Sequence, residues 1–428
     1  MRRRAVLFVA IFLGLAWAVR GHFGHEQGAA WAGGIGALAV VAASGRVDWF
    51  KRLPWLGALG AIGWGVGGMM SYGIVVGYGR AQDFGNVFYG LTMLAVVGGL
   101  YGFIGGGMLG LGLESSEERR PDWPRLLTEM LAGGFLFWGF LIYQLGWRMT
   151  PPRSELWAGC LGAAVSLAWY AWRQGFFRSL RLAWFSALGA GFGFAFGNFL
   201  QTLGSASGLA FNWWNVMEFT LGFLGGAGMA YGVFTTDWPR SGHTTAATNG
   251  FGLVVLLVLI PALNIDQAFD YRDLLNTARR LGLAHPTQVA LLQLVGAVTL
   301  AVVALVAGVV AWRRVEWAGE TALRRASVWA VFGYAVTYIL MSHIKKNVFV
   351  SLAGQPEQVI YWVLLVLALL LWVTSLRHGQ IFPLGEVHGL TWSTWFRSFV
   401  VLVALCALLS LISVHAHGPL PGAHQRFS

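Results

Sequence analysis

Long apolar stretches separated by short polar connections run through almost the whole chain. A helix of about 20 apolar residues is long enough to cross the hydrocarbon core of a bilayer. Stretches of helix-spanning length lie at residues 5–20, 28–44, 54–78, 86–112, 126–146, 156–172, 181–203, 215–234, 245–263, 287–312, 326–343, 358–376 and 396–415. The pattern predicts an all-α, polytopic integral membrane protein with about thirteen transmembrane helices.

The connection between the ninth and tenth stretches has a different pattern. From Ile265 to Leu283, apolar residues recur at helical spacing and alternate with charged residues such as Asp270 and Arg279. This pattern is typical of a helix that lies in the membrane surface. We therefore expect an outer amphipathic helix near residues 265–283, either as a passive surface helix or as a lid over a pocket.

Composition supports the same class of protein. Of the 428 residues, 57% are hydrophobic and 11% are charged, whereas soluble domains have roughly 25% charged residues. The 59 glycines would allow helices to approach closely, which is how membrane helices associate. Cys160 and Cys406 both lie within apolar stretches, so we expect no disulfide framework.

Basic residues give the chain a net charge of +11, but they are scattered in ones to threes between apolar stretches. This distribution is typical of membrane-protein loops and does not indicate a nucleic-acid partner. If the N-terminus is cytoplasmic, 19 of the 29 Lys and Arg residues fall on the cytoplasmic side. The positive-inside rule therefore favours a cytoplasmic N-terminus and an outer C-terminus, in what we expect to be a bacterial inner membrane.

The first stretch has a second interpretation. Three arginines, an apolar core and Ala16-Trp17-Ala18 resemble a signal peptide with its cleavage site. A transmembrane helix is favoured because the duplication described next gives this stretch a counterpart.

Four short motifs occur twice in the same order. They are WAGGIGA at 31–37 and WAGCLGA at 157–163, ALGA at 58–61 and 187–190, FIGG at 103–106 and FLGG at 223–226, and DWPR at 122–125 and 237–240. They indicate two copies of a four-helix unit, in the same orientation because the number of helices is even. We predict a first repeat at 1–122, a second at 123–240 and a five-helix bundle at 241–428, which could include a diverged third copy.

Ionisable and amide residues gather at the predicted outer ends of these helices. Because such groups are costly in hydrocarbon unless they are satisfied, they point to function in a membrane protein. The substrate-binding candidates are Arg20, Tyr72, Arg80, Arg148, Arg153, Glu155, Asn198, Gln201, Asn212, Trp213 and Asn215. The proton-coupling candidates are His22, His25, Glu26 and Glu218. The alternative is a set of structural networks between helices.

Two further motifs lead to no cofactor prediction. His22, His25 and Glu26 could present metal ligands on one helix face, but their order differs from HExxH and no further ligand cluster accompanies them. Gly-rich strings such as Gly63-x-Gly65 lie inside apolar stretches, where close helix packing explains them better than phosphate binding. We therefore expect no metal, no cofactor and no ATP drive.

These features favour a secondary transporter for a small polar or anionic solute, such as a sugar or sugar acid, coupled to H⁺ or Na⁺. Its site would open to the outer face between the two repeats. Membrane lipids would surround the protein. A second hypothesis is a membrane enzyme that acts on a lipid-linked or saccharide substrate at the outer leaflet, with Glu26, Glu155 or Asp83 as acid or base. A third is a scaffold subunit of a membrane complex. The sequence leaves the substrate and the oligomeric state open.

Overall fold

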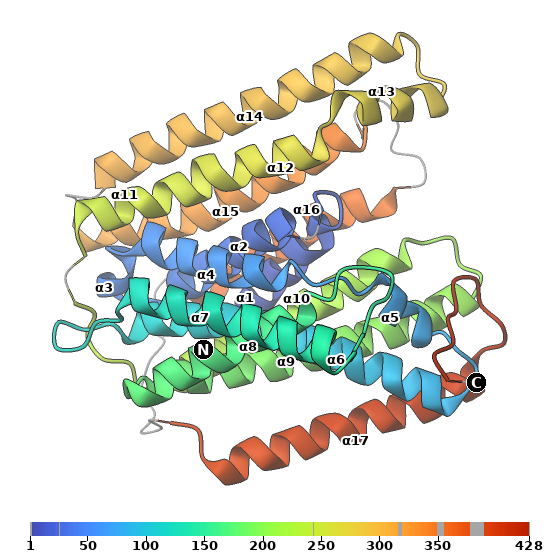
Figure 1. Ribbon diagram of the computed structural model, residues 1–428. Helices are drawn as coiled ribbons and strands as arrows, with labels where there is room; N and C mark the ends of the chain where they lie inside the picture. Colours follow the sequence, from blue (N-terminus) through green and yellow to red (C-terminus); the bar gives the residue numbers. More distant parts are fainter. Residues whose placement is uncertain are drawn as a thin grey trace.

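The computed structural model describes residues 2–24, 26–242, 244–315, 319–348, 355–376 and 389–427, and every regular element in these ranges is a helix. Nine of the described helices are long and apolar enough to cross a membrane, which indicates an integral membrane protein. Most helices lie side by side, with their connections at two ends of the bundle (Figure 1). We call the end that carries Arg20, α5, α13 and the C-terminal segment the Arg20 end.

The long helices mostly alternate in direction, and three of them contain a π-helical turn. The elements are α1 (Arg2–Arg20), α2 (Glu26–Ser44), α3 (Val47–Phe50), α4 (Leu53–Gly67), α5 (Gly73–Tyr78), α6 (Phe84–Glu114), α7 (Trp123–Trp138), η1 (Gly139–Gln144), α8 (Trp157–Arg173), α9 (Phe177–Ala206), α10 (Trp213–Phe234), α11 (Ala246–Val254), η2 (Val255–Leu259), α12 (Ile260–Ala268), α13 (Tyr271–Arg280), α14 (Pro286–Val315), α15 (Glu320–Lys345), α16 (Pro356–Leu371), η3 (Trp372–Leu376) and α17 (Trp392–Ala416).

Each predicted apolar stretch coincides with helical residues, but not every one qualifies as a span. The helices α1, α4, α8 and α10 are not among the nine that satisfy the length and hydropathy of a membrane span. The α4 helix has only 15 residues and is about 22 Å long at 1.5 Å per residue, which is less than the thickness of a bilayer core. Thirteen crossings and two repeats therefore stay predictions.

The third predicted stretch, residues 54–78, is interrupted. Helix α4 ends at Gly67, the chain continues without regular structure, and the short α5 begins at Gly73 after Tyr72. A Cβ at Gly67 would press into the ring of Tyr101 on α6, and glycines such as Gly67 and Gly68 have a low helix propensity. The break places Tyr72 inside the bundle, where its side chain is buried.

The predicted surface helix is present but shorter than expected. Residues up to Ala268 complete α12, and α13 covers only Tyr271–Arg280. Asp270 caps α13 by accepting hydrogen bonds from the backbone N–H groups of Arg272 and Asp273. The helix packs against α14, with Leu274 and Ala278 buried.

The core of the bundle depends on close contact between helices. Helix α6 packs along α9, α9 along α10, and α10 along α1, while α2 packs on α4. At the α6–α9 contact, a Cβ on Gly102 would overlap the carbonyl oxygen of Ser186. Only glycine permits such an approach, as expected for helices that associate by close packing.

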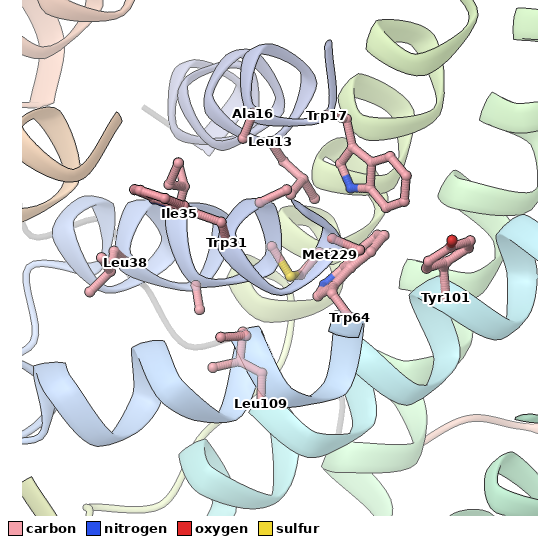
Figure 2. Close-up of a cluster of buried hydrophobic side chains, with 14 of the residues drawn as sticks. Leu13, Ala16, Trp17, Trp31, Ile35, Leu38, Trp64, Tyr101, Leu109 and Met229 are labelled. Atoms are coloured by element: carbon pink, nitrogen blue, oxygen red, sulfur yellow. The ribbon is translucent and has the colours of Figure 1, made fainter. Parts of the chain in front are cut away.

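Large aromatic side chains fill the centre where α1, α4 and α6 meet. Figure 2 shows Trp17, Trp64 and Tyr101 next to one another in this core. The ring centroids of Trp17 and Tyr101 are 4.9 Å apart in an edge-to-face arrangement, and those of Trp17 and Trp64 are 5.7 Å apart. This cluster forms the apolar floor of the polar site at the Arg20 end.

Candidate functional site

A buried ion pair lies at the break between α4 and α5. Arg20, the last residue of α1, donates from Nη1 to Oε1 of Glu218 on α10 at 2.7 Å, and the two side chains are 1% and 2% exposed. Tyr72 accepts a hydrogen bond from the same guanidinium at 2.5 Å and donates to Glu218 Oε1 at 3.0 Å. Trp214 Nε1 donates to that oxygen as well, at 3.1 Å. Three elements distant in sequence thus meet at one carboxylate oxygen.

Aromatic rings enclose the ion pair. The guanidinium carbon of Arg20 lies 4.7 Å from the ring centroid of Trp17 and 5.6 Å from that of Tyr72. The rings of Tyr72 and Trp214 are nearly parallel, with centroids 6.3 Å apart. Cation–π contacts of this kind help to hold a desolvated guanidinium in place.

The second oxygen of Glu218 lies close to the protein exterior. Glu218 Oε2 is buried and accepts no hydrogen bond from any residue that the structure describes. It lies beside Gly21, an exposed residue in the turn that follows Arg20, where an added Cβ would be only 2.9 Å away. Gly21 thus separates this buried oxygen from the exposed surface of the turn.

A methyl group at residue 21 is expected to disturb this ion pair. Because Glu218 is held by Arg20 and Tyr72, it cannot retreat from a new Cβ without stretching those hydrogen bonds. We expect Gly21→Ala to lower the free energy of unfolding in detergent micelles by about 1–2 kcal/mol. Gly73→Ala is the matched control, since a Cβ at Gly73 has no neighbour within 4 Å. Equal stabilities of the two variants would contradict the placement of Glu218.

A second polar network adjoins the ion pair and joins α10 to α15 and α16. Asn215 Nδ2 donates to the carbonyl oxygen of Ala18 and to the hydroxyl of Tyr361, both at 2.7 Å. On α15, the Ser342 hydroxyl donates to Gln358 Oε1 at 3.2 Å and lies 2.6 Å from His22 Nδ1. The α1–α2 turn is therefore bound to α15 through His22, and Ser342 links it on to Gln358 of α16.

His343 extends this network. Its Nδ1 donates to Gln358 Oε1 at 2.8 Å, and its Nε2 accepts from Trp362 Nε1 at 2.7 Å. Sequence reasoning did not select Gln358, Tyr361 or Trp362. The signal for Gln358 and Tyr361 was present as polar groups three residues apart at the start of an apolar stretch.

His22 is neutral near pH 7 in this setting. Burial lowers the pKa of His22 well below its usual range, and the positive charges of Lys346 and Lys345 lower it further. A neutral imidazole can exchange hydrogen bonds with Ser342, but it gains a proton only in acidic solution. The proton-coupling role predicted for His22 would therefore operate only below neutral pH.

Other predicted site residues lie apart from the ion pair. In the loop before α8, Glu155 accepts hydrogen bonds from the backbone N–H groups of Met149 and Thr150 and from Trp157 Nε1. Arg148 and Arg153 lie exposed in the same loop. Arg20 of the first predicted repeat thus pairs with Glu218 of the second, whereas Arg148, Arg153 and Glu155 stay in the loop before α8.

The amide residues of α9 support the short helix α5. Asn198 Nδ2 donates to Gln201 Oε1 at 3.1 Å and to the carbonyl oxygen of Val76 at 3.4 Å. Both amide side chains are fully buried. Asn198 thereby holds α5 in position.

The C-terminal segment lies over α5. His424 donates its backbone N–H to the carbonyl oxygen of Gly77, and Arg80 donates to the carbonyl oxygen of Pro421 at 3.2 Å. Asn86 Oδ1 accepts from the backbone N–H groups of Arg426 and Phe427 at 2.6 and 3.0 Å. Arg80 therefore belongs to this covering contact.

The two remaining substrate-binding candidates lie at the start of α10. Asn212 caps the helix through Asn215 N, and its Nδ2 lies 3.4 Å from Glu357 Oε1. Trp213 donates from Nε1 to the carbonyl oxygen of Leu209, and its ring abuts Gly204. His25 and the side chain of Glu26 lie outside the described residues. The structure thus brings together Arg20, Tyr72 and Glu218, with Asn215 and Asn212 alongside.

The described residues contain no group of three or more His, Cys, Asp or Glu side chains that could hold a metal ion. No family model, curated protein or solved structure matches the chain. Its own residues carry the functional argument.

Proposed function

We propose that the protein is a secondary transporter for a small polar or anionic solute, and that Arg20, Glu218 and Tyr72 form its substrate and coupling site. The observation that carries the proposal is a buried ion pair located at a break in an apolar helix. Secondary transporters commonly bind their solutes and coupling ions where membrane helices are discontinuous. An ionisable pair in such a place is expensive, which favours a functional role over a purely structural one.

The pair suggests a mechanism of coupling. While Glu218 is ionised, it neutralises Arg20. A proton taken up by Glu218 would leave the guanidinium without its charge partner, and Arg20 could then hold a carboxylate or phosphate group of the solute by forked hydrogen bonds. One proton and one negative charge would bind together, so the buried site would remain close to neutral. The rings of Tyr72 and Trp214 would pack against the solute, as they would against a sugar acid.

The proposal also includes the number of membrane crossings, the repeats and the orientation of the chain. We infer thirteen crossings, with parallel repeats at 1–122 and 123–240 and a five-helix bundle at 241–428. We also infer an inner-membrane location, with the N-terminus in the cytoplasm and the Arg20 end outside. The duplicated motifs support the repeats, since three of the four pairs lie inside helices in the same order: α2 with α8, α4 with α9, and α6 with α10.

Counterflow in proteoliposomes tests the proposal. Vesicles that contain the purified protein are loaded with unlabelled sugar acids, other organic acids or neutral sugars, and uptake of the same labelled compound is measured. We expect exchange of at least one acid, and accumulation of that acid when the outside is made more acidic. Well-folded protein that exchanges none of the compounds would contradict transport. Exchange of neutral sugars alone would contradict the role given to Arg20.

The enzyme hypothesis receives less support from the same contacts. Asp83 caps α6 by accepting from Asn86 N at 2.8 Å and also binds the Asn86 amide. Glu155 is occupied by the three local hydrogen bonds described above. Both carboxylates thus serve as local hydrogen-bond acceptors, and the side chain of the third candidate, Glu26, lies outside the described residues.

A further inference from the structure

A large cavity lies between helices α14 and α15, away from the ion pair. Its volume is about 770 Å³, and α2, α4, α11 and η2 contribute its inner wall. At the Arg20 end the two helices are tied together, because Gln293 on α14 donates to the carbonyl oxygens of Ile344 and Lys345. The cavity occupies the opposite half of the bundle, where the two helices are joined through the α14–α15 connection.

Small residues line both facing walls of the cavity. On α14 the lining includes Ala304, Gly308 and Ala311, and on α15 it includes Ala326 and Gly333. A Cβ added at Gly333 would have no neighbour within 4 Å. Membrane helices with small residues usually pack directly on each other, so an open space between two such faces is suited to a slender apolar occupant.

The mouth of the cavity is positively charged. Arg314, near the end of α14, and Arg325, in the second turn of α15, both line it and are exposed. Neither forms an ion pair or hydrogen bond with the residues that the structure describes. Trp312 and Trp329 lie beside them, as is typical of the level of lipid headgroups.

We propose that this cavity binds one anionic phospholipid, with an acyl chain between the small-residue faces and the phosphate between Arg314 and Arg325. Basic pockets between transmembrane helices recognise acidic headgroups in this way. An acyl chain fits the apolar walls, and two guanidinium groups without a bond to any described residue fit a headgroup with net negative charge better than a zwitterionic one. The inference does not depend on the transport proposal, because the cavity shares no residue with the Arg20–Glu218 site.

Lipid binding to the delipidated full-length protein tests the proposal. The probes are phosphatidylglycerol and phosphatidylcholine in mixed micelles, with bound lipid counted by native mass spectrometry. We expect one phosphatidylglycerol to bind more tightly than phosphatidylcholine, by about tenfold or more, since basic residues near a headgroup favour an anionic lipid. Equal binding of the two lipids would overturn the proposal.

Three variants locate the site. Arg314→Gln/Arg325→Gln is expected to reduce phosphatidylglycerol binding about tenfold or more, whereas Arg313→Gln, an exposed arginine outside the cavity lining, should leave it within twofold. Ala326→Trp should block both lipids by filling the cavity. A photoreactive acyl chain on phosphatidylglycerol should label the α14 and α15 peptides of the unmodified protein, so the result does not depend on whether any variant folds. Labelling elsewhere, or loss of binding in Arg313→Gln equal to that in the double variant, would overturn the proposal.

Discussion

Removal of the Arg20 guanidinium is expected to destabilise the protein by about 3–5 kcal/mol, because Glu218 would be left as a buried charge without compensation. Both side chains are almost completely inaccessible, so water cannot replace the lost partner. We expect Arg20→Met to show this loss in reversible unfolding of the protein in bicelles. Glu218→Gln should also be destabilised, since it leaves the buried guanidinium unpaired.

The double variant Arg20→Met/Glu218→Gln separates ion pairing from general packing. With both charges absent, the desolvation cost also disappears, and we expect most of the stability to return. The matched control is the solvent-accessible pair of Arg125 and Glu129, 2.9 Å apart on α7, for which Arg125→Gln should cost no more than about 0.5 kcal/mol because Arg173 still pairs with Glu129. Additive losses at Arg20 and Glu218 would contradict a coupled buried pair.

The apolar pattern could predict where helices form, because a helix in a bilayer must be apolar for most of its length. It could also single out Arg20 and Glu218, since each is an ionisable residue inside or at the edge of an apolar stretch. It could not pair them, because they are 198 residues apart in the chain and only the packing of α1 on α10 brings them together. The site was therefore predictable as a set of candidates and not as a contact.

The break after α4 was not predicted, for a related reason. Averaged over residues 54–78, the chain is apolar enough for one continuous helix, and the average conceals the local weakness at Gly67 and Gly68. Tyr72 forms hydrogen bonds with Arg20 and Glu218. These tertiary contacts stabilise the interrupted conformation. They exist only in the assembled bundle.

The DWPR motif makes different contacts at its two positions. Asp122 caps α7 as its sequence suggests, by accepting from Arg125 N. Its counterpart Asp237 begins no helix, because the next helix starts at Ala246 with Thr245 as its cap. There, Arg46 instead binds the carbonyl oxygens of Trp238 and Pro239, so the same four residues make different contacts.

Glu218→Gln is also expected to separate coupling from binding if the transport proposal is correct. Glutamine keeps the shape of the side chain and one acceptor oxygen for Tyr72 and Trp214, but it cannot exchange a proton. Accumulation of solute driven by a pH gradient should fall by roughly ten- to a hundredfold, which corresponds to the loss of a hydrogen bond to a charged group at about 1.5–3 kcal/mol. Counterflow at equal pH on both sides requires no net proton movement, so it should persist with a smaller loss. Both rates are measured in the same proteoliposomes, with Glu129→Gln as a control that removes a carboxylate bound to Arg125 and Arg173 instead of Arg20. Equal loss of both rates would assign Glu218 to binding alone, and unchanged accumulation would exclude it from coupling.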